Sequence, residues 1–283
     1  MSGQLPATLV NGEPLDSISS SDRGLLYGDG VFETLAVQNG SCQYWSRHLA
    51  RLQAGCKRLA IPAVDAERLA ADARRLVASA AQGVLKIIVT RGSGGRGYRV
   101  PEQTVPTRIL QLYPWPDFAP SSAATGVLAR LCNSRLGHNP LLAGIKHLNR
   151  LEQVLARQEW DDPEIMEGLL MDVDGHLIEG TMSNLFVVRR GALLTPDLRS
   201  CGVAGIMRSI ILDLAGQASV DTRVCVITQA DLAQADEVFL TNSLIGIWPV
   251  IAVDDDRYRK GPLTQRLQAL LAEHTDHSSD WRA

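Results

Sequence analysis

The chain has 283 residues, which is enough for a large hydrophobic core and for one or two domains. Apolar residues make up 45% and charged residues 21%, an ordinary balance for a soluble protein. The net charge of −3 at pH 7 gives no electrostatic attraction to nucleic acid or to an anionic membrane, so neither is an expected partner.

Targeting signals and cysteine usage both point to the cytoplasm. The first six residues lack the basic and apolar segments of a secretory signal, and no apolar run is long enough to span a bilayer. Five widely spaced cysteines, an odd number, fit reduced thiols better than a disulfide framework or a zinc site. We therefore expect a cytoplasmic protein and no metal site.

The first part of the chain is predicted to form strands and two helices. Asn-Gly pairs at 11–12 and 39–40 indicate tight turns. Strands are expected at 31–38, 42–45, 83–90 and 107–113, and helices at about 46–59 and 65–81. Ser46 is the expected N-cap of the first of these helices.

A proline-rich stretch at 114–122 is predicted to link two domains, 1–113 and 123–283. Beyond it, strands are expected at 126–132, 166–173, 176–179 and 237–240. Helices are expected from about Leu148 to Trp160, from about Gly205 through Leu214, and from 262 to 271. The mixture indicates the α+β class.

One lysine stands out by its surroundings. Lys146 follows five uncharged residues, 141–145, and precedes a helical pattern of apolar residues at 148, 151, 154 and 155. Apolar surroundings favour the neutral form of an amine, and a neutral amine is a nucleophile that can form a Schiff base.

Several stretches around this lysine resemble one family. Residues 144–155, with the sequence G-I-K-H-L-N-R-L-E-Q-V-L, resemble the lysine segment of aminodeoxychorismate lyases. These are fold-type IV pyridoxal-phosphate enzymes, as are D-amino acid and branched-chain aminotransferases. The glycine-rich loop at 22–30, H-L-A-R-L at 48–52, R-G-S-G-G-R-G-Y at 91–98 and E-G-T-M-S-N at 179–184 extend the likeness from Asn11 to about Leu271. The resemblance implies a D-amino acid aminotransferase-like fold.

The resemblance also implies a role for individual residues. Lys146 would hold pyridoxal 5′-phosphate covalently and act as the catalytic base, and Glu179 would pair with the pyridinium nitrogen so that the ring is an electron sink. Arg51 would bind the cofactor phosphate. The other residues implied at the cofactor are Thr181, Ser183, Ile206, Met207, Asn242 and Ser243.

The implied reaction is the conversion of 4-amino-4-deoxychorismate to 4-aminobenzoate and pyruvate, which serves folate biosynthesis. Arg91, Arg96 and Tyr98 are candidates for binding the substrate, although the sequence leaves open which arginine contacts which carboxylate. An aminotransferase acting on D-amino or branched-chain amino acids is the alternative within the fold, and a binding protein without catalysis is the alternative outside it. The family likeness further implies a homodimer.

Overall fold

The structure, a computed structural model, describes residues 7–119 and 121–275 and divides into two compact units. Of the described residues, the first unit contains 7–116 together with Ile145–Asn149, and the second contains the described part of Asp117–Gly144 and residues 150–275. The change between Pro116 and Asp117 falls inside the predicted linker. The segment that carries Lys146 groups with the first unit, whereas the sequence placed it in the second domain.

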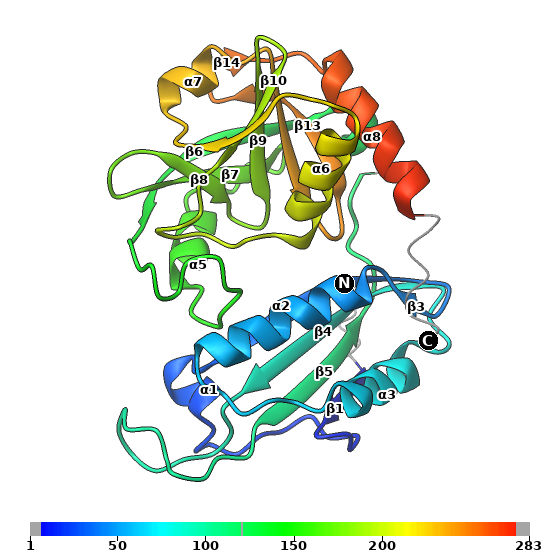
Figure 1. Cartoon of the computed structure of the whole chain (residues 1–283), viewed down its shortest axis with the longest axis vertical. Helices are drawn as coiled ribbons and strands as arrows, with labels where there is room; N and C mark the ends of the chain where they lie inside the picture. Colours follow the sequence, from blue (N-terminus) through cyan, green and yellow to red (C-terminus); the bar gives the residue numbers. More distant parts are fainter. Residues whose placement is uncertain (1–6, 120, 276–283) are drawn as a thin grey trace. The chain divides into compact units, whose positions relative to one another are not determined.

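The first unit is a five-stranded antiparallel sheet with helices packed against it (Figure 1). The strand order is β1-β5-β4-β2-β3. Its elements, in chain order, are β1 (Ala7–Val10), α1 (Arg23–Tyr27), β2 (Gly30–Gln38), β3 (Ser41–Cys42), α2 (Trp45–Arg58), α3 (Ala66–Val77), β4 (Gln82–Thr90) and β5 (Thr107–Tyr113).

An acidic residue lies in the core of this unit. Side chains alternate across a strand, so Val31, Glu33 and Leu35 of β2 share one face. Glu33 is opposite Ile87 of β4, and the apolar residues around it belong to one core cluster that includes α2 and α3. Glu33 itself is 1% exposed. A carboxylate at such a position needs strong partners, because burial penalises its charge.

The second unit is built on a nine-stranded mixed sheet. The strand order is β11-β10-β9-β12-β13-β6-β7-β8, with β14 on β13. The elements are α4 (Ser122–Thr125), β6 (Val127–Leu136), α5 (Leu151–Arg157), β7 (Ile165–Asp172), β8 (Leu177–Gly180), β9 (Asn184–Arg189), β10 (Ala192–Pro196), α6 (Ile206–Gln217), β11 (Thr222–Cys225), α7 (Gln229–Ala233), β12 (Glu237–Asn242), β13 (Gly246–Val253), β14 (Asp256–Arg257) and α8 (Pro262–Thr275).

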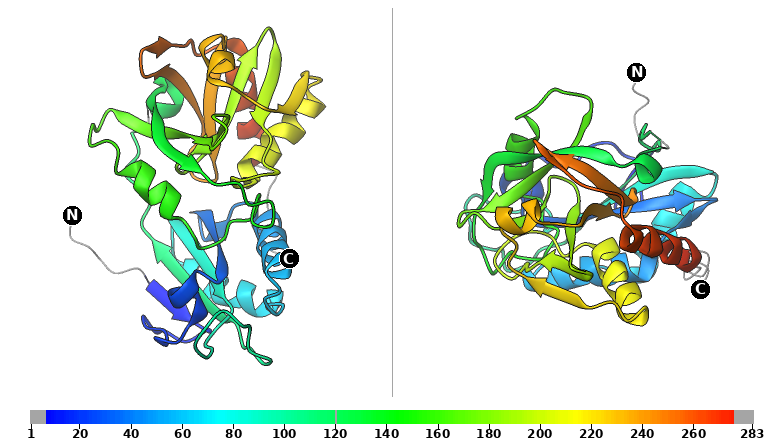
Figure 2. Two further views of the ribbon diagram at one scale, coloured as in Figure 1. Left: turned by 90° about the vertical axis from the view of Figure 1, so that its left-hand side faces the viewer. Right: turned by 90° about the horizontal axis from the view of Figure 1, so that it is seen from above.

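This second sheet closes on itself. β8 pairs with β7 and also with β9 through Glu179 and Asn184, so six strands form a ring, β9-β12-β13-β6-β7-β8. Closure leaves fewer open edges and places Glu179 where two strands meet. Helices α6 and α8 contact each other and both contact β12 (Figures 1 and 2).

Two predicted helix features were wrong. The helix α2 begins at Trp45, with Tyr44 as N-cap in a left-handed conformation and no side-chain cap, so Ser46 lies inside the helix. The helix after Lys146 spans only Leu151–Arg157, and its apolar residues at 151, 154 and 155 are exposed instead of facing a core. Periodicity finds an apolar face but does not say what covers it.

Three broader expectations can be compared with the structure. The mixture of helices and sheets confirms the α+β class. All five cysteines are free thiols. Among the described residues, no helix combines the length and the apolar character that crossing a membrane requires.

Candidate active site

Lys146 is held in the first unit by the beginning of β2. The amide of Phe32 donates to the carbonyl of Lys146 over 2.9 Å, and the amide of Leu148 donates to the carbonyl of Gly30 over 3.0 Å. These bonds add the lysine segment to β2 as a short antiparallel extension. The Lys146 Nζ lies 4.5 Å from the centre of the Phe32 ring, a cation–π distance. Backbone and side chain together therefore fix the position of the amine.

The guanidinium of Arg51 is bound by Glu33, a residue that the sequence did not indicate as functional. The Nε and Nη2 of Arg51 donate to the two carboxylate oxygens of Glu33 over 2.8 and 2.5 Å. His48 Nδ1 lies 2.6 Å from the same carboxylate. Both donors come from α2, three residues apart and so on one face of the helix.

The charges of this group can be worked out from burial and neighbours. Burial by itself would raise the pKa of Glu33, but the Arg51 guanidinium and the hydrogen bonds from Arg51 and His48 outweigh it and lower that pKa to about 2. Burial lowers the pKa of His48, and Glu33 opposes this only in part. His48 is thus a neutral imidazole that donates from Nδ1, and Arg51 supplies the positive charge.

Glu179 is the buried carboxylate of the second unit. It is 4% exposed, on β8. Its Oε2 accepts the amide of Val203 over 2.7 Å, and Gln153 Nε2 lies 3.4 Å from its Oε1. The Oε1 of Gln153 is buried and has no hydrogen-bond partner among the described residues. Glu179 and Gln153 therefore offer a carboxylate and an unpaired amide oxygen side by side, and a bound group with an N–H donor would fit there.

The helix α6 presents an uncapped N-terminus in the same unit. Gly205 is its N-cap, without a side-chain cap, and Ile206 and Met207 are the first two helical residues. A Cβ at Gly205 would lie 2.0 Å from Asn184 Oδ1, so only glycine fits there. Backbone N–H groups and the helix dipole at such an end attract anions. Ile206 and Met207 provide backbone N–H groups at this helix start, and their contact with a phosphate stays a prediction.

Thr181 and Ser183 contact a second buried acid, Glu167. Their hydroxyls donate to Glu167, over 2.5 and 2.7 Å, and the amides of Thr181 and Met182 donate to it as well. Glu167 is buried, which raises its pKa, and these hydrogen bonds oppose that rise. The hydroxyls have no proton left for a phosphate. They shape the turn after Glu179, and their contact with the cofactor stays a prediction.

Asn242 also serves the backbone. Its Oδ1 accepts the amides of Leu244 and Ile245 over 2.8 and 3.0 Å, and its Nδ2 donates to the carbonyl of Met182 over 3.1 Å. These bonds close the turn between β12 and β13. Asn242 thus has a structural role, and both Asn242 and the adjacent Ser243 are half-buried and stay predicted cofactor residues.

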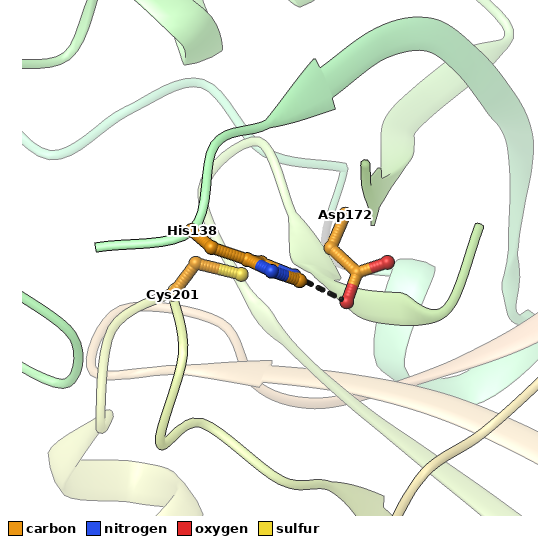
Figure 3. Close-up of side chains that lie close together, drawn as sticks. All are labelled: His138, Asp172 and Cys201. Carbon is orange, nitrogen blue, oxygen red and sulfur yellow. Dashed lines mark hydrogen bonds and ion pairs between the residues drawn. The ribbon is translucent and has the colours of Figure 1, made fainter. Parts of the chain in front are cut away.

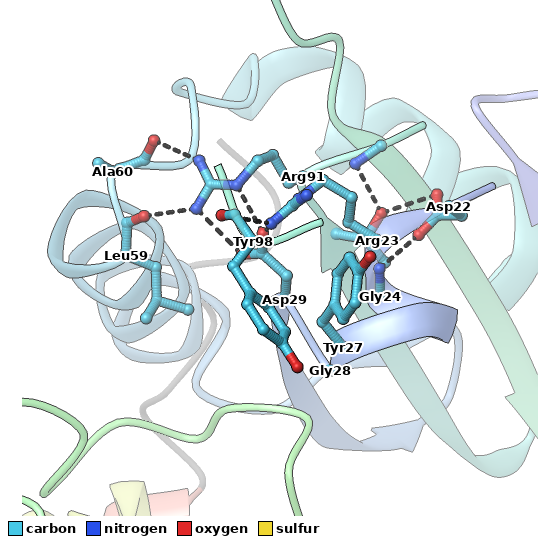
Figure 4. A network of polar contacts seen from close by, with 12 residues as sticks. Asp22, Arg23, Gly24, Tyr27, Gly28, Asp29, Leu59, Ala60, Arg91 and Tyr98 are labelled. Carbon is cyan, nitrogen blue, oxygen red and sulfur yellow. Dashed lines mark hydrogen bonds and ion pairs between the residues drawn. The ribbon is translucent and has the colours of Figure 1, made fainter. Parts of the chain in front are cut away.

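The predicted substrate residues of the first unit fall into two groups (Figure 4). Arg91 is buried; it donates to both oxygens of Asp29 over 2.7 and 3.0 Å and to the carbonyls of Leu59 and Ala60 over 2.7 Å each. These bonds give Arg91 a structural role inside the protein, and its contact with the substrate stays a prediction. Burial would raise the pKa of Asp29, but Arg91 and Arg23 lower it.

Arg96 and Tyr98 remain on the surface. Tyr98 is 85% exposed and Arg96 is also exposed. The base of their loop is anchored, because Arg23 donates to the carbonyls of Gly97 and Tyr98 over 3.0 and 3.3 Å. The loop thus presents its side chains from a fixed backbone.

Comparison with known proteins gives a consistent family. The family model described as amino-transferase class IV matches residues 30–253. An aminodeoxychorismate lyase from Vibrio harveyi is 37% identical over 266 residues, which cover 93% of this chain and 98% of that protein. The crystal structure of 4-amino-4-deoxychorismate lyase from Pseudomonas aeruginosa is 48% identical, has a TM-score of 0.91, and covers 95% of this chain and 99% of its own.

Aminotransferases are more distant. A structure of the Escherichia coli branched-chain amino acid aminotransferase is 25% identical with a TM-score of 0.85, and the two chains are covered to 98% and 97%. The predicted fold-type IV architecture is confirmed by these similarities. The chain belongs to the class IV aminotransferase family.

Proposed function

We propose that this chain is a pyridoxal-phosphate-dependent lyase that converts 4-amino-4-deoxychorismate to 4-aminobenzoate and pyruvate. The observation that carries the proposal is the 48% identity, over 95% of the chain, to the Pseudomonas aeruginosa 4-amino-4-deoxychorismate lyase. The family model matches residues 30–253, a range that contains both the lysine and the buried acid. The product 4-aminobenzoate places the reaction in folate biosynthesis.

The residues present fit the cofactor. Its phosphate suits the uncapped start of α6, where the Cβ-free Gly205 allows a close approach to the amides of Ile206 and Met207. In the first unit, Arg51, bound by Glu33, offers a guanidinium of the kind that binds phosphate, and in the second unit Ser243 is a further candidate donor. The pyridine N–H suits Glu179, beside the orphaned Oε1 of Gln153.

The catalytic work divides between the cofactor and the chain. When bound, pyridoxal phosphate supplies an electron sink for the carbanion. Glu179, oriented by the Val203 amide, keeps the proton on the ring nitrogen. With the cofactor bound, Lys146 would hold it covalently through Nζ, and its amine, when free, would serve as the base for the proton on the amine-bearing ring carbon of the substrate. The enolpyruvyl group would leave through cleavage of the ring C–O bond and become pyruvate when its methylene carbon gains a proton. The remaining ring would be aromatic, and this aromaticity would drive the reaction.

Substrate binding is assigned to the loop after β4. Arg96 and Tyr98 are exposed on an anchored backbone, and a guanidinium is the group best suited to a carboxylate of the substrate. Arg91 is left out of this proposal because its donors are used by Asp29, Leu59 and Ala60.

A parallel product assay tests the function. The holoenzyme is supplied with 4-amino-4-deoxychorismate, and 4-aminobenzoate and pyruvate are measured in the same samples. Equal amounts of both products are expected. Their absence, together with amine exchange that depends on an added keto acid, would instead establish the aminotransferase reading, which the likeness to branched-chain aminotransferases keeps as the second candidate.

We also propose a homodimer in the cytoplasm. On α5, Leu151 is 75% exposed, and Val154 and Leu155 are exposed on the same short helix. An apolar face of this kind marks a contact surface, and a second copy is the commonest partner. The five free thiols fit a reducing compartment.

Light scattering after size exclusion tests the assembly. Leu151→Asp is expected to reduce the mass from about two chains to one, because a charge in an apolar interface is costly. Val173→Asp is the matched control, since Val173 is 60% exposed elsewhere in the second unit. A wild-type protein that elutes as a monomer would rule the dimer out.

A further inference from the structure

A cluster of metal-ligating side chains lies in the second unit, around Asp172 at the end of β7 (Figure 3). His138 Nε2 is 3.0 Å from Asp172 Oδ2. The ligand atoms of His138, Asp172 and Cys201 all lie within 4.8 Å of one another. The three residues come from separate segments of the chain, so the cluster is a product of the fold.

Asp172 is held in a fixed orientation. Its Oδ1 accepts the amides of Asp174 and His176 over 3.0 and 2.9 Å, at the turn between β7 and β8. Its Oδ2 therefore points toward His138, and His176 Nδ1 lies 3.4 Å from that same oxygen. Ligands oriented by backbone hydrogen bonds in this way are typical of metal sites.

The spacing of these ligands suits a small tetrahedral ion. Zinc bonds of about 2.0–2.1 Å to nitrogen or oxygen and about 2.3 Å to sulfur give tetrahedral ligand separations of roughly 3.3–3.6 Å. The ligand atoms of His138, Asp172 and Cys201 are now up to 4.8 Å apart, so they would have to approach one another by at most about 1.5 Å. The partly exposed imidazole of His138 can make such a movement by changing its rotamer. His176 or a water can complete four ligands.

The chemistry of the donors selects the class of ion. A thiol, an imidazole and a carboxylate match zinc-like, borderline-soft cations, whereas Mg²⁺ and Ca²⁺ prefer oxygen ligands alone. The charged groups that act on the thiol of Cys201 are acids, namely Asp172, Glu179 and Glu152, so the local field favours a cation. The Cys201 Sγ makes no hydrogen bond within the described residues, and it is buried.

We propose that His138, Asp172 and Cys201 form a binding site for a divalent cation of the zinc class. On binding, Cys201 releases its thiol proton to solvent and a metal–thiolate bond forms. This departs from the sequence analysis, in which the spacing of cysteines indicated no metal site; the ligands are distant in sequence and meet only through the fold.

The site adjoins the buried acid of the same unit. Cys201 is two residues before Val203, whose amide donates to Glu179 Oε2 over 2.7 Å. An ion bound to Cys201 therefore restrains the segment that orients Glu179.

Metal retention by the holoenzyme tests the proposal. The protein, reconstituted with pyridoxal phosphate, is incubated with excess Zn²⁺, passed through a desalting column, and analysed for metal by mass spectrometry. A parallel titration with Cd²⁺ monitors the ultraviolet charge-transfer band of a thiolate ligand. We expect about one ion per chain, and binding at least about tenfold weaker in Cys201→Ser and in His138→Gln.

Matched control variants distinguish specific binding at His138, Asp172 and Cys201 from nonspecific binding of metal elsewhere on the protein. Cys225→Ser and His274→Gln alter a thiol and an imidazole of the same unit away from Asp172, and both should bind as the wild type does. Circular dichroism checks that each variant is folded; should Cys201→Ser fail to fold, the more exposed His138→Gln still decides the matter. Absence of retained metal, or wild-type retention in either His138→Gln or a folded Cys201→Ser, would overturn the proposal.

Discussion

The buried carboxylate of Glu33 should contribute strongly to the stability of the first unit. Its pKa falls from an ordinary 4.5 to about 2 because Arg51 and His48 bind it in the core. At about 1.4 kcal/mol per pH unit, the difference amounts to roughly 3 kcal/mol at neutral pH. Glu33 is 1% exposed, so solvent screens little of this. Glu33→Gln removes the charge and keeps the volume, and breaking a buried ion pair costs about 3–5 kcal/mol.

Urea unfolding of the cofactor-free protein measures the contribution of Glu33 to the free energy of unfolding. A carboxylate whose folded pKa is depressed stabilises the fold above its unfolded pKa and loses that effect as pH falls toward the folded pKa. The difference between wild type and Glu33→Gln should therefore be full at pH 7 and shrink as the pH falls below 4.5 toward 2. Glu13→Gln, at an exposed glutamate, should show neither effect.

The result that would refute this reasoning is a cost below about 1 kcal/mol at pH 7, or a difference that does not shrink in acid. Because Arg51 loses its anchor in Glu33→Gln, we also expect weaker retention of pyridoxal phosphate, measured by absorbance during dialysis.

Two further substitution pairs test the assignments in the two units. Gly205→Ala should raise the dissociation constant of pyridoxal phosphate about tenfold or more, because the added Cβ would collide with Asn184 at the proposed phosphate-binding end of α6. Gly216→Ala is the control, because an added Cβ there meets nothing within 4 Å. This variant should bind the cofactor as the wild type does. Equal affinity of both variants for pyridoxal phosphate would show that the start of α6 does not bind the phosphate. Arg91→Lys should lower the free energy of unfolding by about 3 kcal/mol, because it loses hydrogen bonds to Asp29 and to the carbonyls of Leu59 and Ala60. Arg96→Gln should leave the urea midpoint unchanged and raise KM about tenfold. A stable Arg91→Lys with a raised KM would restore Arg91 to the substrate site.

The sequence singled out Lys146 and Glu179 as candidates but not Glu33, the residue that holds Arg51. Lys146, Glu179 and the start of α6 belong to contiguous stretches, and such stretches can be compared directly with a family. Glu33 had a signal that was overlooked: it is a charge at an inward-facing position of an apolar strand, two residues from Val31 and Leu35. Buried charges of this kind need partners, and Arg51 on the next helix is the partner.

Other features depend on contacts distant in sequence. Thr181 and Ser183 lie in the turn between β8 and β9, and their hydroxyls donate to Glu167 of β7, a contact that no contiguous stretch of sequence reveals. The same holds for Arg91, whose partner Asp29 is 62 residues away. The helix α5 shows a further limit, because helical periodicity predicts an apolar face equally for a core and for a subunit interface.

Reductive trapping of the cofactor tests the central proposal most directly. The chain has four lysines, at 57, 86, 146 and 260, so borohydride reduction of the holoenzyme followed by peptide mapping has few possible outcomes. We predict a pyridoxyl label on Lys146, and no label in Lys146→Ala. A reconstituted protein that stays colourless and unlabelled, or a label on another lysine, would contradict the account.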